Sequence, residues 1–307
     1  MAEPAPTGTR PEPRDAVPVR HPGRWVAIAV LAVLAAMLVH TLLTNDNFGW
    51  SLVGEYLFSG PILRGLQNTL ILTVLSMLIG ILGGIGLAVM RLSPNPVLSG
   101  VAGVYLWLFR GTPLIAQLLF WSYLSALYPN LSLGIPFGPE FVVFDTNTLI
   151  SPFLACLLGL GLNEAAYMAE IVRGGIQSVD HGQTEAAEAL GMTRVQTLRR
   201  VILPQAMRVI VPPTGNETIG MLKTTSLVVV IGYTELLTSA QRIYSTNFQT
   251  IPLLIVAAAW YLLLTSLLTA GQRVIERRYG RGVAGAVTEG TPLLRSRLLG
   301  KSGEGQA

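Results

Sequence analysis

The sequence predicts an all-α integral membrane protein with about six transmembrane helices of ~20 residues each. Three observations support this fold class. Of the 307 residues, 51% are hydrophobic and 12% are charged, whereas soluble proteins carry about 25% charged residues. The mean hydropathy is +0.54, and several uncharged apolar runs are long enough to cross about 30 Å of hydrocarbon as helices. The arginines, finally, gather in alternate connecting segments.

The chain begins with a polar segment and one separate apolar run. Residues 1–24 are rich in Pro, Arg and Glu, so we expect a disordered cytoplasmic tail. Trp25–Leu43 is apolar except for His40 and Thr41, and 25–43 is predicted to be an additional N-terminal transmembrane helix. A cleaved signal peptide is the alternative, but the leader is long and no small-x-small site ends the run.

Five further apolar runs form the main transmembrane domain, which is expected over residues 62–275. One run is interrupted by the segment 110–113, and the last begins near Pro252, which the first turn of a helix tolerates. A Gly-rich stretch at 280–307 is expected to be a second disordered tail. The runs cover Leu66–Met90, Val97–Tyr128, Thr148–Val172, Met207–Gly232 and Ile251–Gln272.

The distribution of arginine predicts the orientation of the helices. If the N-terminus lies inside, every expected cytoplasmic segment contains arginine, and the outer segments contain only Arg64 and Arg242. The reverse topology would place most of these charges outside, against the positive-inside rule. Both termini are therefore predicted to be cytoplasmic.

The reactive residue types exclude several classes of protein. Cys156 is the sole cysteine, so the chain can form no internal disulfide and no cysteine-based metal site. The three histidines follow no metal-ligand spacing, and no nucleophile–base pair appears in the spans. We expect no metal and no catalytic residue.

A polar segment at 183–204, between the fourth and fifth predicted spans, has strong local signals. Thr184 could cap a short helix over Glu185–Leu190, and Gly191 could supply the left-handed residue that ends it. Thr193 and Gln196 have the spacing of a capping box that begins a second helix. Two arginines suit the last turn of that helix before a proline: Arg199, Arg200 and Pro204. We expect two short cytoplasmic helices at an angle.

Three interpretations fit a segment with this pattern. A DNA-binding helix–turn–helix is disfavoured because membrane spans hold both ends of the unit, so no nucleic acid is expected. A purely structural loop is possible from the pattern alone. The favoured interpretation is a docking element for a cytoplasmic partner.

The same segment resembles the signature loop of ABC importer permeases. That signature is Glu-Ala-Ala, three residues, Gly, nine residues, Ile, one residue and Leu-Pro, and Val201 is the one departure here. The resemblance implies a type I importer permease fold whose coupling helices contact a separate ATPase subunit. The matching residues, expected to make that contact, are Glu185, Ala186, Ala187, Gly191, Leu203 and Pro204.

The resemblance also implies partners and an energy source. ATP and Mg²⁺ would be bound by the partner ATPase, and this chain would bind no cofactor. A second copy of the permease or a paralogue would complete the pathway, and an extracytoplasmic amino-acid-binding protein would deliver the solute.

Gly300-Lys301-Ser302 resembles the end of a phosphate-binding loop, but it lacks the earlier glycine and the preceding strand, so we expect no ATP site in this chain.

A narrower resemblance, over roughly residues 65–279, is to permeases for polar amino acids in the bacterial cytoplasmic membrane. It includes the segments 68–70, 109–114, 169–176 and 225–227. This chain departs from that pattern where it has Glu164, Ala165 and Thr224. An ion-coupled secondary amino-acid transporter is the alternative function, but no internal repeat of several spans supports it.

Polar residues inside the predicted spans are candidates for the solute pathway, because a charge in hydrocarbon costs roughly 2.5–3.5 kcal/mol on insertion scales. Arginine and lysine could meet a solute carboxylate, and the acidic residues an ammonium group. The alternative is that the charges pair with one another to hold the helices together. The candidates are Arg110, Asn163, Glu164, Tyr167, Asn216, Glu217, Lys223, Thr224 and Ser226.

Overall fold

The computed structural model describes residues 22–135 and 138–279, and the chain divides into two compact units, Met1–Gly49 and Trp50–Ala307. The predicted tail at 280–307, most of the predicted tail at 1–24 and the Gly300-Lys301-Ser302 triplet lie outside the described residues.

The first unit contains one long helix. α1 (Pro22–Thr44) is followed by a short 3-10 helix, η1 (Asp46–Phe48), which Asn45 caps and Gly49 ends in the left-handed conformation. No described residue of α1 is buried, and its length and hydropathy suit a membrane span.

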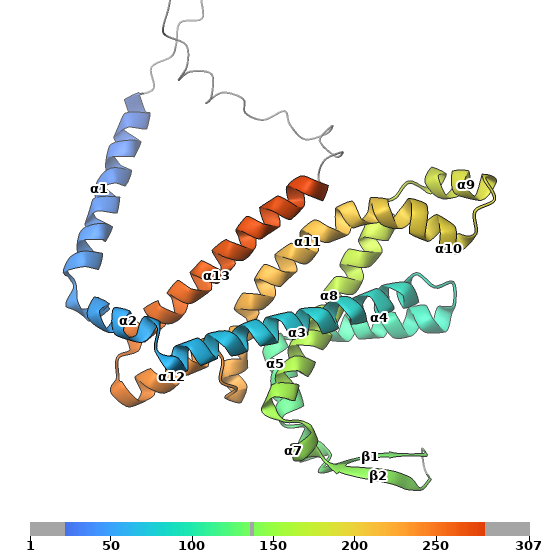
Figure 1. Ribbon diagram of the computed structural model, residues 1–307, viewed down its shortest axis with the longest axis horizontal. Helices are drawn as coiled ribbons and strands as arrows, with labels where there is room; N and C mark the ends of the chain where they lie inside the picture. The colour runs from blue at the N-terminus through green and yellow to red at the C-terminus, as the bar shows by residue number, and fades with distance from the viewer. Residues whose placement is uncertain (1–21, 136–137, 280–307) are drawn as a thin grey trace, which may run out of the picture. The chain divides into compact units, whose positions relative to one another are not determined.

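The second unit is mostly helical (Figure 1). Of all described helices, four are long and apolar enough to cross a membrane: α1, α3, α8 and α13. The number rises to six if two bent pairs each count as one span. The helices of this unit are α2 (Trp50–Leu57), α3 (Gly60–Arg91), α4 (Pro96–Gly111), α5 (Leu114–Ser122), α6 (Leu124–Leu127), α7 (Thr146–Leu149), α8 (Pro152–Gln177), α9 (His181–Ala189), α10 (Arg194–Thr197), the π-helical turn η2 (Leu198–Ile202), α11 (Leu203–Thr224), the 3-10 helix η3 (Thr225–Ile231), α12 (Leu236–Asn247) and α13 (Thr250–Tyr279).

Glycines allow the two central helices, α3 and α8, to approach closely. A side chain at Gly80 would meet Glu164, and one at Gly84 would lie 2.9 Å from the backbone nitrogen of Ala169. Small residues at a helix interface are the usual way to pack helices in membranes, where no hydrophobic driving force acts between them.

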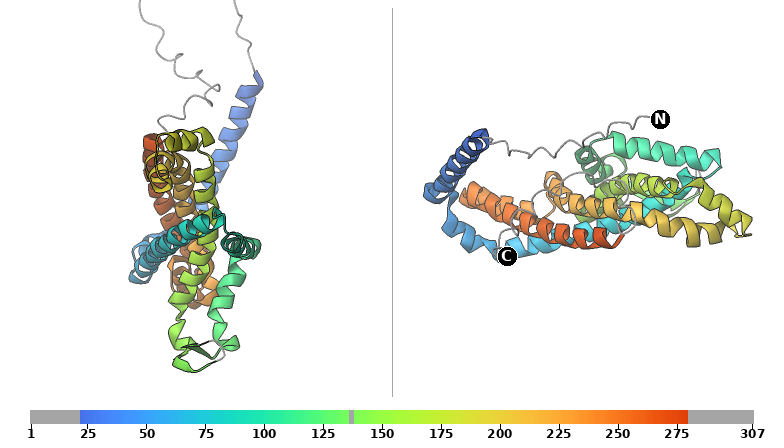
Figure 2. Two further views of the ribbon diagram at one scale, coloured as in Figure 1. Left: turned by 90° about the vertical axis from the view of Figure 1, so that its right-hand side faces the viewer. Right: turned by 90° about the horizontal axis from the view of Figure 1, so that it is seen from above.

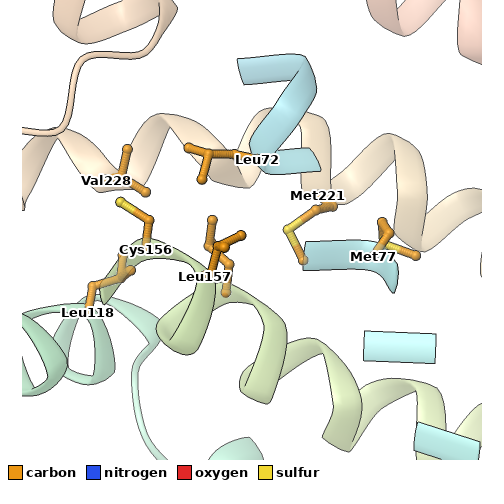
Figure 3. Close-up of a cluster of buried hydrophobic side chains, with 8 residues drawn as sticks. Leu72, Met77, Leu118, Cys156, Leu157, Met221 and Val228 are labelled. Atoms are coloured by element: carbon orange, nitrogen blue, oxygen red, sulfur yellow. The ribbon is translucent and has the colours of Figure 1, made fainter. Parts of the chain in front are cut away.

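Three apolar clusters hold this bundle together, and two of them include residues of α11. The first joins α3, α5, α8, α11 and η3 (Figure 3) and consists of Leu72, Met77, Leu118, Cys156, Leu157, Leu160, Met221 and Val228. The second joins the later parts of α3 and α8 to the beginning of α11 and consists of Ala88, Met168, Val172, Ala206 and Ile210. α11 therefore contributes to both clusters, one at each end.

The third predicted span is not one straight helix. α4 and α5 meet at an angle of 101°. Thr112, which precedes Pro113, has extended backbone angles (φ −111°, ψ 145°), because a proline disfavours helical geometry in the residue before it. The prediction of an interrupted run at 110–113 located the break but not its angle.

The all-α prediction omitted a short β-hairpin. β1 (Asn130–Gly134) pairs antiparallel with β2 (Glu140–Asp145), and the register places Leu131 opposite Phe144 and Leu133 opposite Val142. One face of the hairpin is thus apolar, since side chains alternate along a strand. The predicted start of the fourth span at Thr148 is also too early, because α8 begins at Pro152.

A buried carboxylate organises the segment after η3, which lies between the last two predicted spans. Glu235 caps α12 through the backbone N–H groups of Leu237 and Thr238, and it accepts hydrogen bonds from Tyr261 (2.7 Å) and Thr69 (3.3 Å). This network ties α3, α12 and α13 together.

Candidate coupling loop and translocation pathway

α9 and α10 project beyond the ends of α8 and α11 (Figures 1 and 2). Asp180, rather than the predicted Thr184, caps α9 by accepting the N–H of Gly182 at 2.7 Å, and the helix begins at His181. The Thr184 prediction was wrong because the aspartate lies one turn earlier and α9 is correspondingly longer.

The turn between α9 and α10 has the predicted local chemistry. Gly191 has φ +75°, and its N–H donates to the carbonyl of Glu188 at 2.9 Å. Thr193 and Gln196 form the capping box, in which the Thr193 N–H donates to Gln196 Oε1 at 2.9 Å. The turn is therefore specified by residues within a few positions of it.

The second predicted helix does not end at Arg199 and Arg200. α10 continues through the π-helical turn η2 directly into α11, and Pro204 is the second residue of α11. The loop thus contains one separate short helix and one arm that is continuous with a membrane helix. A displacement of the loop can act directly on α11.

The predicted contact residues differ in exposure. Glu185, Ala186, Gly191, Leu203 and Pro204 are exposed. Ala187 is buried, with 3% of its surface exposed, so in this conformation it packs within the chain rather than facing outward.

The sequence interpretation missed two apolar side chains at the tip of the loop. Leu190 is 83% exposed and Val195 is 73% exposed, on either side of the Gly191 turn. These two exposed apolar side chains are therefore candidates for contact with a partner. The available signal was the apolar residue on each side of a helix-ending glycine.

Among the pathway candidates, Arg110 lies against α8. Its guanidinium is 5.5 Å from the ring centre of Tyr167, and its Nη1 is 4.0 Å from Oε2 of Glu170. The same carboxylate oxygen lies 2.6 Å from Nη2 of Arg173. Glu170 is therefore shared between two arginines, and Arg110 keeps 45% of its side chain exposed.

Asn163 supports the bend between α4 and α5. Its amide Nδ2 donates to the carbonyl of Phe109 (2.9 Å) and to Gln117 Oε1 (3.2 Å). Gln117 in turn donates to Thr112 at 2.8 Å. The donors of Asn163 are used in holding this corner, which favours a structural role over direct contact with solute.

Glu164 is buried where α8 meets α3. It is 5% exposed, its side chain lies over Gly80, and its Oε1 has no hydrogen-bond partner among the described residues. Glu217 on α11 is close enough to interact with it electrostatically. Glu164 is therefore a buried carboxyl group, one oxygen of which accepts no hydrogen bond from the described residues.

The remaining candidates lie on α11 and η3. Lys223 and Ser226 line a shallow hollow beside α13 with Tyr261 and Thr265, and Ser226 donates to the Lys223 carbonyl at 2.6 Å. No carboxylate of the described residues lies within 4.0 Å of Lys223. Asn216 is exposed, and Glu217 and Thr224 are half-buried.

The candidates thus form separate groups in this chain. Arg110 and Tyr167 lie between α4 and α8, Glu164 lies between α8 and α3, and Lys223 lies beside α13. The alternative, in which the charges pair with one another, applies to Arg110, which forms an ion pair with Glu170. It does not apply to Lys223 within the described residues.

Comparison with known proteins identifies the class. Residues 80–281 match the family described as binding-protein-dependent transport system inner membrane component, and the chain belongs to this family. It is therefore a multi-pass protein of the inner membrane.

Named relatives narrow the class to amino-acid systems. The chain is 50% identical over 287 residues to the arginine transport system permease protein ArgU of Corynebacterium glutamicum, which covers 93% of this chain and 89% of the relative. It is 39% identical over 237 residues to the L-cystine permease protein TcyB of Bacillus subtilis (76% and 93%). It is 34% identical over 233 residues to the glutamine permease protein GlnP of Escherichia coli K12 (76% and 98%).

Solved structures agree with this fold. An amino acid ABC transporter crystallised with histidines matches with TM-score 0.61 and 38% identity, covering 71% of this chain and 94% of that one. The MetNI methionine transporter matches with TM-score 0.55 and 19% identity, covering 72% and 99%, and shows the fold alone. This chain is the permease component of an amino-acid ABC importer, and the ion-coupled alternative is set aside.

Proposed function

We propose that this permease imports a cationic L-amino acid of the arginine type. The observation that carries the proposal is the carboxyl of Glu164, which lies on the central helix α8 with one oxygen that has no hydrogen-bond partner in the part of the chain that the structure describes. Burying an unpaired carboxylate is costly, and a guanidinium or ammonium group of a passing solute would offset that cost.

The relatives support the same solute class. A protein named as an arginine permease is 50% identical over almost the whole chain, whereas the glutamine permease protein is 34% identical over a shorter part. Glu217 adds a second acidic group near Glu164. Two carboxyl groups beside the pathway favour a cation over an acidic amino acid.

Access to Glu164 requires a change of conformation. Gly80 of α3 packs against the Cβ and Cγ atoms of Glu164, and the side chain is buried, so the solute would reach the carboxyl group when α3 and α8 shift relative to each other. Alternating access of this kind is a rigid-body movement of packed helices. Arg110, with nearly half of its side chain exposed, would meet the carboxylate of the solute.

The energy would come from a separate ATPase subunit docked on the segment 183–204. In this proposal ATP and Mg²⁺ bind to that subunit and not to this chain. Leu190 and Val195 would enter its cleft as the apolar tip, flanked by the exposed Glu185 and Ala186. A second permease copy or a paralogue would complete the pathway, and both termini would be cytoplasmic.

Delivery of the solute would depend on an extracytoplasmic amino-acid-binding protein. The Glu235-capped helix α12 and the hairpin β1–β2 lie on the side of the unit away from α9 and α10, where that protein would dock (Figure 1).

The test is uptake of labelled L-arginine, L-lysine, L-glutamine and L-glutamate by cells with and without this gene, before and after ATP depletion at constant membrane potential. We expect ATP-dependent uptake of L-arginine or L-lysine. In Glu164→Gln, uptake of the cation should fall about tenfold or more relative to glutamine, the range of a lost charged hydrogen bond.

Glu55→Gln in α2 is the matched control, because it removes an exposed carboxylate that belongs neither to the pathway candidates nor to the proposed docking surfaces. It should leave the preference unchanged. An unchanged arginine-to-glutamine ratio in Glu164→Gln would contradict the role of Glu164, and a preference of the wild type for glutamate would contradict the solute class.

A further inference from the structure

The middle of α11 contains a weak point. Pro212 and Pro213 lie inside the helix and have no backbone N–H, so the carbonyls of Arg208 and Val209 lose their usual helical donors. Prolines are the common cause of sharp bends in helices. We call Pro212–Gly215 the diproline joint.

The two sides of this joint pack in different clusters. Before it, Ala206 and Ile210 pack with Met168 and Val172 on the loop side of the bundle. After it, Met221 packs with Leu157 and the cluster of Figure 3. A bend at the joint would therefore let the part of α11 continuous with α10 move without the part that carries Glu217 and Lys223.

One side chain from another helix bonds to the joint. Gln272 of α13 is 6% exposed, and its Nε2 donates to the carbonyl of Pro212 at 2.8 Å and to Glu276 Oε1 at 3.0 Å. Burying an amide in a membrane-spanning helix costs free energy unless the amide is hydrogen-bonded. The two hydrogen bonds of Gln272 offset this cost and fix its side chain on the Pro212 carbonyl.

Gly215 makes this contact possible. A side-chain carbon at position 215 would collide with the amide of Gln272, at its Oε1, Cδ and Nε2 atoms. The Gln272 amide therefore lies directly against the backbone of α11. It contacts Gly215 and, about one helical turn earlier, donates to the carbonyl of Pro212. Two residues of α11 and one of α13 form a single fitted contact.

We propose that Gln272 is a positioning residue that braces the diproline joint, so that α11 acts as a stiff lever between the loop 183–204 and the solute pathway. Without the brace, α11 bends at Pro212–Pro213 and absorbs the displacement. ATP is then hydrolysed with less transport. This inference rests on the proposed ATP-driven function.

The test uses the full transporter with its ATPase and binding protein in liposomes, and measures solute imported per ATP hydrolysed. In Gln272→Leu this ratio should fall about three- to tenfold, the factor that one lost hydrogen bond represents, while the ATPase rate persists. Gly215→Ala should give the same fall, because it displaces Gln272. Gly271→Ala, on the neighbouring residue with open space around it, should leave the ratio unchanged.

A rescue variant separates the brace from general packing. Pro212→Ala restores an N–H for the Arg208 carbonyl and stiffens the joint, so in the Gln272→Leu background it should recover most of the lost ratio. A Gln272→Leu variant with the wild-type ratio, or a double variant without recovery, would overturn the brace. Wild-type uptake that needs no ATP would overturn the proposed function first, before any variant is compared.

Discussion

The loop 183–204 and the interior face between α3 and α8 are built in opposite ways. The loop is held by local contacts: Asp180 caps α9, Gly191 turns the chain, and Thr193 pairs with Gln196. The interior is held by contacts between residues distant in sequence, such as Gly80 with Glu164. The loop leaves the apolar side chains of Leu190 and Val195 exposed, whereas the interior buries the carboxyl group of Glu164.

This contrast indicates where substitutions should matter for folding and where they should matter for assembly. Changes in the interior should act on stability, because added atoms there would overlap with the facing helix. Changes at the loop tip should leave the fold intact and act on binding. Three predictions test this contrast, in order of decreasing effect.

The largest effect is expected at Gly84, where even one added carbon would lie 2.9 Å from the Ala169 backbone nitrogen. Gly84→Leu should lower the free energy of unfolding by about 3 kcal/mol, the upper range for overpacking. Thermal unfolding of the purified protein in detergent measures it. Gly86→Leu is the control, since position 86 on the same helix has open space. Equal stability of the two variants would contradict the close packing of α3 on α8.

An intermediate effect is expected at the loop tip. Leu190→Asp should weaken binding of the ATPase subunit about tenfold or more, because a buried leucine contributes ~1.5–3 kcal/mol. The unfolding temperature should not change, since Leu190 is 83% exposed. Co-purification and titration with the ATPase measure the affinity. Leu190→Met should bind like the wild type. If Leu190→Asp also bound like the wild type, the tip of the loop would not be part of the ATPase interface.

The smallest effect is expected at the turn itself. Gly191→Ala places a side chain on a residue with φ +75°, which costs about 1–2 kcal/mol. Hydrogen exchange of the amides in α9 and α10 should speed up accordingly. Gly174→Ala, in a regular helix with open space, should not speed it. If both variants behave alike, the left-handed turn is not what holds the two helices in place.

Sequence signals grouped some of the candidate pathway residues without revealing their partners. Asn163, Tyr167 and Glu170 have the i, i+4 and i+7 spacing of one helical face. Tyr167 and Glu170 do both contact Arg110. Asn163 instead uses its amide to hold Phe109 and Gln117. The spacing in the sequence predicts which residues share a helical face. The contacts that each residue makes with other helices determine its role.

By itself, the sequence determined the apolar spans, the family, the arginine asymmetry and the turn at Gly191. Each of these depends on hydropathy over one span or on caps within a few residues. Only the tertiary structure decided the 101° bend at Thr112-Pro113, the burial of Ala187 and Glu164, and the contact of Gln272 with Pro212. These features depend on which helices pack together, and that is set by side chains far apart in the chain.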